Sequence, residues 1–96
     1  MNIIKFSPEF GQWLAAVRDL KGKVKIIARL ERAAQGNFGD AKSLGGGLHE
    51  MRVPFGPGYR IYYTQRGDIV YLLLVGGDKS SQSRDMAKAR AMMESE

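Results

Sequence analysis

Ninety-six residues are enough for one domain with a single hydrophobic core and too few for two. Hydrophobic residues make up 44% and charged residues 26%, a balance typical of globular proteins. The absence of cysteine excludes disulfides, thiolate nucleophiles and cysteine-ligated zinc. A formal net charge of +5 favours nucleic acid or an acidic protein as the partner.

No targeting or membrane-spanning segment is predicted. The longest apolar run, residues 69–75, is far shorter than the roughly 20 residues that span a bilayer. The first residues lack the basic region, long apolar stretch and cleavage site of a signal peptide. We therefore expect a cytoplasmic protein that does not bind membranes. With one histidine and no cysteine the chain offers few metal ligands, so we expect no metal and no other cofactor.

The first third of the chain predicts a strand at residues 2–6 and then two helices. The first helix begins with Ser7 as the N-cap, Pro8 at the first helical position and Glu9 at the positive end of the helix dipole. Its expected core residues recur at helical spacing: Phe10, Trp13, Leu14 and Val17.

The second helix is predicted at residues 23–35, and Gly36 ends it. Its expected buried face consists of Val24, Ile27, Leu30 and Ala34. On the opposite side, Lys25, Arg29 and Arg32 recur at i, i+4 and i+7 and form a basic stripe. This stripe is either a solvated helix face or a contact surface for phosphate or a partner. The short link between the helices predicts an antiparallel hairpin.

After a predicted loop at residues 35–47, the second half of the chain predicts three antiparallel strands and a helix. The strands are expected at residues 48–53, 59–64 and 69–75, with turns at residues 54–58 and 65–68. The last strand is almost wholly apolar and should be covered on both faces. Gly76 and Gly77 end it, and Asp78 or Ser80 caps a final helix with an apolar side that consists of Met86, Ala89 and Met93.

The predicted fold is therefore β-α-α-β-β-β-α, an α+β domain with helices packed on an antiparallel sheet. Alternation along the first two strands of the sheet assigns two sets of residues. The expected core set is His49, Met51, Val53, Tyr59, Ile61 and Tyr63. The expected outer set is Glu50, Arg52, Arg60 and Tyr62, with Lys79 at the same end of the sheet.

This outer cluster could handle a polyanion such as RNA. Metal-free RNA cleavage requires activation of a 2′-hydroxyl, stabilisation of charge on the phosphoryl oxygens and protonation of the leaving oxygen. Arginine suits the second task because its planar fork matches phosphate and stays charged. We assign the candidate catalytic residues as Arg60, Arg52 and Lys79. The candidate RNA-binding residues are Tyr62, Gln82, Lys25, Arg29 and Arg32.

Each candidate has a structural alternative. Arg60 could form a salt bridge with Glu50 across the strand pair, and flanking arginines favour a pairing role for Glu50 over a role as general base. His49 falls on the apolar face, which favours a buried histidine over an acid–base catalyst. Asp78 is interpreted as a helix cap.

Two stretches of sequence resemble a known family: GNFGDAKSLGGGLHEMRVPFGPGYRIYY and LLLVGGDKSSQSRDMAKA. They are similar to the addiction-module killer proteins, a HigB-like branch of the RelE/ParE toxin superfamily. The resemblance covers essentially the whole chain and implies the β-α-α-β-β-β-α order. It also implies a type II toxin that cleaves mRNA on the ribosome and is silenced by a cognate antitoxin protein.

The resemblance matches some catalytic positions of RelE-like nucleases and not others. Arg60 matches the arginine of the Tyr-Arg pair, Lys79 the basic residue after the strand-ending glycine, and Arg52 a basic residue on the preceding strand. The strand lysines of RelE fall at Leu48 and Glu50, and its last-helix tyrosine falls near Met86.

Two other functions stay open. ParE-type relatives poison DNA gyrase and cleave no RNA, so a non-nuclease toxin is the alternative. A nucleic-acid-binding accessory protein is the third hypothesis. In a toxin, the antitoxin is expected to cover the cationic sheet face or the helical hairpin, where acidic or amphipathic segments would suit the basic stripe.

Overall fold

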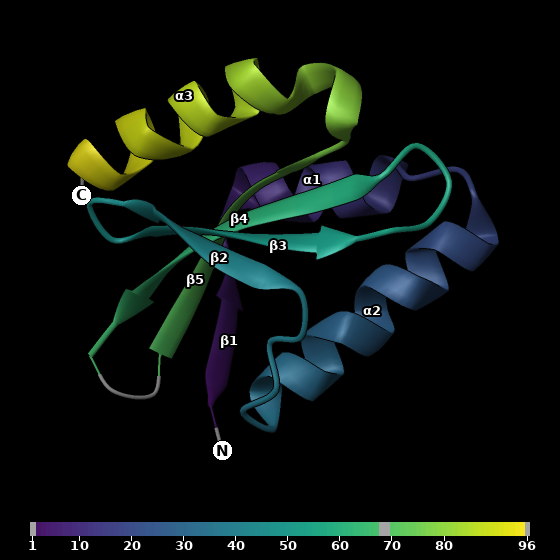
Figure 1. The fold of residues 1–96 in the computed structure, drawn as a ribbon, viewed down its shortest axis with the longest axis horizontal. Coiled ribbons are helices and arrows are strands. Elements are labelled where there is room, and N and C mark those ends of the chain that lie inside the picture. Colours follow the sequence, from purple (N-terminus) through teal and green to yellow (C-terminus); the bar gives the residue numbers. More distant parts are fainter. Residues whose placement is uncertain (1, 68–69, 96) are drawn as a thin grey trace.

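The computed structural model describes residues 2–67 and 70–95. This part of the chain forms a compact α+β fold with three α-helices and a five-stranded mixed sheet (Figure 1). In chain order the elements are β1 (Ile3–Phe6), α1 (Pro8–Ala16), α2 (Leu20–Ala34), β2 (Ala41–Gly45), β3 (Leu48–Val53), β4 (Tyr59–Arg66), β5 (Val70–Gly77), the 3-10 helix η1 (Lys79–Ser81) and α3 (Gln82–Glu94). Across the sheet the strands run β1-β5-β4-β3-β2.

The predicted α+β class is confirmed, but the sheet differs from the prediction in two ways. The predicted loop contains strand β2, which pairs antiparallel with β3. Strand β1 pairs with β5 in parallel, so the sheet is mixed and not wholly antiparallel. Both differences depend on which strands pair in the folded sheet, and local sequence does not show this. A short Gly/Ser-containing segment such as β2 also lacks the apolar alternation that would reveal a strand.

The start of α1 is the one that the sequence predicts. The Ser7 hydroxyl accepts a hydrogen bond from the Phe10 amide at 2.9 Å and donates one to the Leu74 carbonyl oxygen at 2.6 Å. Pro8 occupies the first turn, where its missing N–H costs nothing. Phe10 is fully buried, and Trp13 packs against it and against Tyr59.

The predicted buried face of α2 is wrong. The helix begins at Leu20, earlier than predicted, because the Asp19 carboxylate caps it through the Lys21 amide at 3.1 Å. Val24 and Ile27 are exposed. The buried residues are instead Gly22, Ile26, Arg29, Leu30 and Ala33.

Gly22 is one reason why α2 buries this side, because a residue without a side chain lets the Tyr59 ring lie close to the helix. A Cβ at Gly22 would lie 2.7 Å from the Tyr59 hydroxyl oxygen. The end of the helix agrees with the prediction: Gly36 has φ of 95°, and its amide donates to the Ala33 carbonyl oxygen at 2.9 Å. Helix α1 packs mainly on β5, and α2 packs on β1 and β3, so each helix is anchored on the sheet more than on the other helix.

Both faces of the sheet are covered. Helices α1 and α2 pack on one face around Phe10, Ile26 and Leu73. Helix α3 packs on the other face around Tyr62, Leu74 and Ala89, joined by Met86 and Met93 as predicted. Strand β5 is therefore covered on both sides, as expected, but the predicted outer face of β3 and β4 lies under α3 (Figure 1).

The remaining predicted boundaries agree in part. Strand β3 has the predicted limits, and β5 ends at Gly77. Gln65 and Arg66 of the second predicted turn belong to β4, whereas Asp68 and Ile69 lie outside the described residues. Within the described ranges, the helices are all too short or too polar to cross a bilayer.

Gly76 should tolerate no side chain, because the indole ring of Trp13 occupies the space where a Cβ would stand. We expect Gly76→Ala to lower the free energy of unfolding by about 1–3 kcal/mol through overpacking. Gly11→Ala is the matched control: no heavy atom lies within 4 Å of its added Cβ, and alanine should stabilise the helix by about 0.5–1 kcal/mol. Urea unfolding of both variants measures this, and equal effects would contradict the close Trp13–Gly76 contact.

Candidate functional site

The three candidate catalytic residues lie at the same end of the sheet. Arg52 on β3 stands opposite Arg60 on β4, and Arg60 stands opposite Gly77 on β5. Lys79 follows two residues later, at the start of η1, and is exposed. A Cβ at Gly58 would lie 3.7 Å from the Lys79 Cβ, which places Lys79 beside the turn between β3 and β4.

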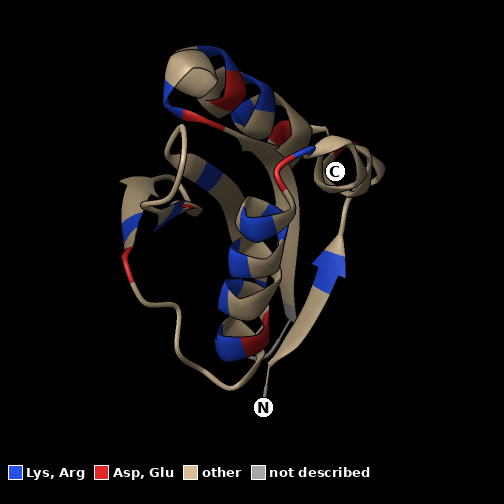
Figure 2. Ribbon diagram, turned by 90° about the vertical axis from the view of Figure 1, so that its right-hand side faces the viewer, with Lys and Arg blue, Asp and Glu red and all other residues tan. Residues whose placement is uncertain are grey.

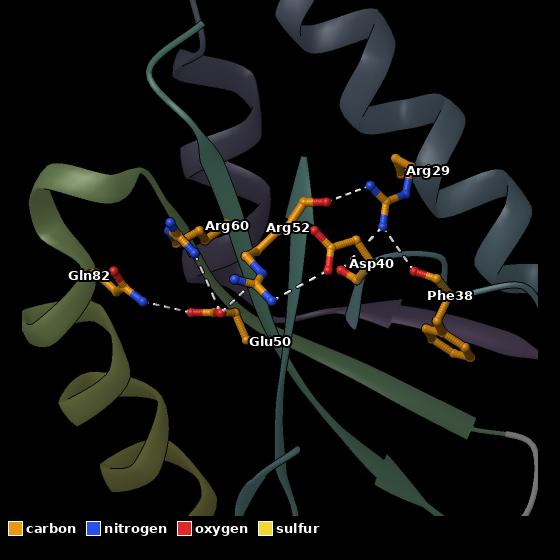
Figure 3. Close-up of polar contacts among 7 residues, drawn as sticks. All are labelled: Arg29, Phe38, Asp40, Glu50, Arg52, Arg60 and Gln82. Carbon is orange, nitrogen blue, oxygen red and sulfur yellow. Dashed lines mark hydrogen bonds and ion pairs between the residues drawn. The ribbon is translucent and has the colours of Figure 1, made fainter. Parts of the chain in front are cut away.

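A buried carboxylate stands at the centre of this sheet end. Glu50 is 0% exposed, and its Oε1 lies 3.5 Å from Arg60 Nη1 and 3.8 Å from Arg52 Nε. Its Oε2 accepts a hydrogen bond from Gln82 Nε2, at the start of α3, at 3.1 Å (Figure 3). An unpaired buried charge is strongly unfavourable, so these contacts bind β3, β4 and α3 together. Glu50 therefore pairs with the arginines, as the structural alternative for Arg60 anticipated.

The cluster is charge-balanced. Arg52 Nη2 also lies 3.4 Å from Asp40 Oδ1, in the segment that leads into β2. Two arginines thus face two carboxylates, with a formal net charge of zero (Figure 3). The expectation that this face is cationic is wrong for these four residues. Asp40 was not predicted as a member of this cluster, because its approach to Arg52 depends on the pairing of β2 with β3.

The two arginines nevertheless keep donors for an anion. A guanidinium has five N–H donors. The Nε atoms of Arg52 and Arg60 are buried without a hydrogen-bond partner, so the donors that could reach an anion are the terminal N–H groups. The Arg52 side chain is 38% exposed and the Arg60 side chain 13% exposed, so both border the surface. Phosphate oxygens are the ligands that such forked donors match best.

Two candidate RNA-binding residues lie inside the protein. Tyr62 is 0% exposed beneath α3, so the prediction that its ring faces outward is wrong, and it cannot stack on a base while α3 covers it. Burial, and then the Glu50 carboxylate, raise the pKa of Tyr62. Gln82 is half-buried and donates its amide hydrogen to Glu50.

Two other polar residues have the roles that the sequence favours. His49 is half-buried on the core face, where its ring stacks on Tyr63 with centroids 5.2 Å apart. Asp78 caps η1, accepting from the Ser80 amide at 2.8 Å. A further hydrogen bond from the Ser80 hydroxyl lowers the pKa of Asp78.

Arg29 does not belong to an exposed basic stripe. It is 8% exposed, and its guanidinium donates to the carbonyl oxygens of Arg52 and of Phe38, the latter at 2.9 Å (Figure 3). Burial, and then the neighbouring Arg32, lower the pKa of Arg29. Gly39, with φ of 62°, allows the loop to approach, because a Cβ there would lie 2.9 Å from Arg29 Nη2. Arg29 therefore holds the loop after α2 against β3.

The remaining two residues of the predicted stripe border a groove. Lys25 and Arg32 are exposed, and with Arg29 they line a hollow of about 420 Å³ between α2 and the turn after β3. Lys25 Nζ lies 5.3 Å from the centroid of the Phe55 ring. Figure 2 shows that Lys and Arg recur along the whole length of α2.

The buried position of Arg29 predicts a large effect of its removal on stability. In Arg29→Met the Phe38 and Arg52 carbonyl oxygens would lose their donor, at a cost of about 1–3 kcal/mol each. The exposed neighbour provides the control, since Arg32→Met should change the free energy of unfolding by less than about 0.5 kcal/mol. Chemical unfolding of both variants tests the difference, and similar losses would contradict the structural role of Arg29.

Comparison with known proteins shows a relative that is similar along nearly the whole chain. No family model matches the chain. A protein of Haemophilus influenzae, described only as an uncharacterized protein, is 42% identical over 89 residues, which are 93% of this chain and 90% of that protein. Such identity along nearly the full length of both proteins shows common descent. The chain therefore belongs to the same family as this Haemophilus influenzae protein.

Proposed function

We propose that the chain is the toxin of a type II toxin–antitoxin system. In this proposal it is a metal-independent endoribonuclease that cleaves mRNA on the ribosome and is neutralised by a cognate antitoxin protein. We extend the proposal to a RelE-like fold, since the order implied by the resemblance occurs here with one added strand, β2.

One observation carries the proposal. The two motifs that resemble the toxin family, GPGYR and GGDK, are separated by fifteen residues of sequence and come together in the sheet. Arg60 of the first motif stands opposite Gly77 of the second, and Lys79 follows at the same sheet end. The residues that the resemblance assigns to phosphate chemistry therefore share one location.

This location suits stabilisation of a phosphoryl transition state. In RNA cleavage the 2′-oxygen bonds to phosphorus and the bond to the 5′-oxygen breaks; the 2′-hydroxyl proton passes to solvent water, and the leaving 5′-oxygen takes a proton from water. Negative charge builds on the non-bridging oxygens, and Arg60 would donate to them. Glu50 and the sheet hold Arg60 in place beforehand, which is the arrangement that makes such donors effective. Arg52 and Lys79 would bind the adjoining phosphates.

A second candidate is a non-nuclease toxin that binds a protein target such as DNA gyrase. The carboxylate of Glu50 forms ion pairs with Arg52 and Arg60 and accepts a hydrogen bond from Gln82, and the Tyr62 hydroxyl is buried. In the described part of the chain, the residues that surround Arg60 thus supply no accessible general base. An inhibitor that acts by binding needs none, so this arrangement favours the second candidate over a complete catalytic site.

Arg60→Lys tests the role of the guanidinium without leaving Glu50 unpaired. A lysine keeps the positive charge but loses the planar fork, so we expect at least a 100-fold loss of cleavage, on the order expected for removing an oxyanion donor. The measurement is induced expression without the antitoxin, with mRNA ends mapped by primer extension within minutes. Lys5→Ala, an exposed lysine on the edge strand β1, should cleave as the parent does.

The same experiment separates the functions. New mRNA ends that disappear in Arg60→Lys support the nuclease. Growth arrest with DNA damage and without new ends would move the assignment to a target-binding toxin. Normal growth of cells that produce the parent chain would remove both toxin hypotheses and leave a nucleic-acid-binding accessory protein.

Glu50→Gln distinguishes a paired carboxylate from a general base. The amide retains hydrogen-bonding atoms near the arginines, so we expect cleavage by the folded variant to fall by less than about tenfold, with an unchanged pH profile. Removal of a general base would instead cost about 100-fold to 10,000-fold. Purified protein and ribosome-bound mRNA, assayed from pH 6 to pH 9, give the answer, with Glu94→Gln at the exposed end of α3 as the control.

A further inference from the structure

Helix α2 presents a line of exposed aliphatic side chains. Leu20 is 74% exposed, Val24 58% and Ile27 41%. Their spacing of i, i+4 and i+7 places them along one side of the helix. A single exposed aliphatic residue is ordinary, but three in a row form an apolar stripe of the kind that marks a contact surface. A shallow hollow of about 390 Å³ adjoins it, lined by Leu20, Lys21, Val24 and Lys25.

The positive charge of the protein is concentrated on the same helix. Residues 20–34 contain five basic residues and one acidic residue, a formal charge of +4, against +5 for the whole chain. The sheet-end cluster of Arg52, Arg60, Glu50 and Asp40 adds nothing to this balance. An approaching acidic group is therefore attracted mainly to α2 (Figure 2).

The exposed cations lie along one flank of the apolar stripe. Lys21 and Lys25 directly follow Leu20 and Val24, and Arg32 continues the same flank along the helix. The first turn of α2 contains no acidic residue, although negative charge is what the positive end of a helix dipole favours. The Asp19 carboxylate at the N-cap is the acidic group of this helix end, where Lys21, Lys23 and Lys25 lie, so the start of the helix keeps an excess of positive charge.

These features favour a protein partner over RNA. Phosphate groups would pair with the cations, but they gain nothing from three exposed aliphatic side chains. A second copy of this chain would bring a like charge of +4 against the helix, which repels. A helix with an apolar stripe and acidic residues beside it would satisfy both the aliphatic line and the cationic flank.

We propose that α2 is the docking surface for an acidic amphipathic helix of a partner protein. Leu20, Val24 and Ile27 would bury against the apolar stripe of the partner, and Lys21 and Lys25, with Arg32, would pair with its acidic residues. Arg29 takes no part, because its guanidinium is bound to backbone carbonyls. This inference depends on α2 alone and holds whether or not the sheet end cleaves RNA.

The test uses a synthetic 18-residue helical peptide with leucines on one side and glutamates beside them, labelled with fluorescein. Fluorescence anisotropy with the full chain should show saturable binding that weakens as salt is raised. The double variant Val24→Ser/Ile27→Ser should weaken binding at least about tenfold, as expected for loss of buried anchors. Ile3→Ser, which alters an exposed aliphatic residue on β1, is the matched control and should bind as the parent does.

Charge exchange tests the cationic flank. Lys21→Glu/Lys25→Glu should lose the acidic peptide and gain a version in which lysines replace the glutamates. Arg60→Lys should bind the acidic peptide normally, so a failed nuclease assay would not count against docking. Circular dichroism confirms that each variant is folded.

Three results would overturn the proposal. Equal competition by a scrambled peptide of the same composition would show that binding is unspecific charge attraction. Binding of a 12-nucleotide oligouridine that is lost in Lys21→Glu/Lys25→Glu, with no peptide binding, would make α2 an RNA-binding surface. Self-association in sedimentation experiments that Val24→Ser/Ile27→Ser abolishes would make the occupant a second copy of the chain.

Discussion

The completely buried carboxylate of Glu50 needs cationic and hydrogen-bonding partners, and the sheet end is arranged around that need. Its partners come from three elements: Arg52 from its own strand β3, Arg60 from β4 and Gln82 from the first turn of α3. In a low-dielectric interior a charge that loses its partners is costly, so these elements are held in fixed relative positions. The same contacts orient both guanidinium groups before any ligand arrives. The contacts that stabilise Glu50 therefore also fix the arrangement of the residues that we propose bind phosphate.

Because of this pairing, the molecule has two differently charged surfaces, one at the sheet end and one on α2. At the sheet end the charges of the arginines and carboxylates cancel, and the partly exposed guanidinium groups of Arg52 and Arg60 provide directional N–H donors. On α2 the cations are not cancelled, and they stand beside exposed aliphatic residues. Directional donors suit a phosphate held in a defined geometry. Uncompensated charge with an apolar stripe suits a broad contact with an acidic partner. The two surfaces can therefore serve different ligands.

Local features of the sequence were good guides wherever one residue decides the outcome. Ser7 and Pro8 begin α1 and Gly36 ends α2, because a helix cap or a positive φ angle depends on the residue in that place. Alternation along β3 and β4 also separated the residues of the two sheet faces correctly. Helix α2 is different, because apolar residues occur on two of its sides. Arg29 is buried and donates to the carbonyl oxygens of Phe38 in the loop and Arg52 on β3, which no helical pattern reveals.

The sequence by itself determined the α+β class, the limits of β3, the Ser7 cap of α1, the end of α2 at Gly36 and the residue types available for anion binding. Only the tertiary structure decided that α3 covers the supposed outer face, that β1 joins β5 in parallel, and that Arg29 turns inward. The physical reason is that burial is a property of pairs of surfaces. An amphipathic segment shows which of its sides could be buried, but the partner surface, brought from elsewhere in the chain, selects the side that is buried and the charges that are left exposed.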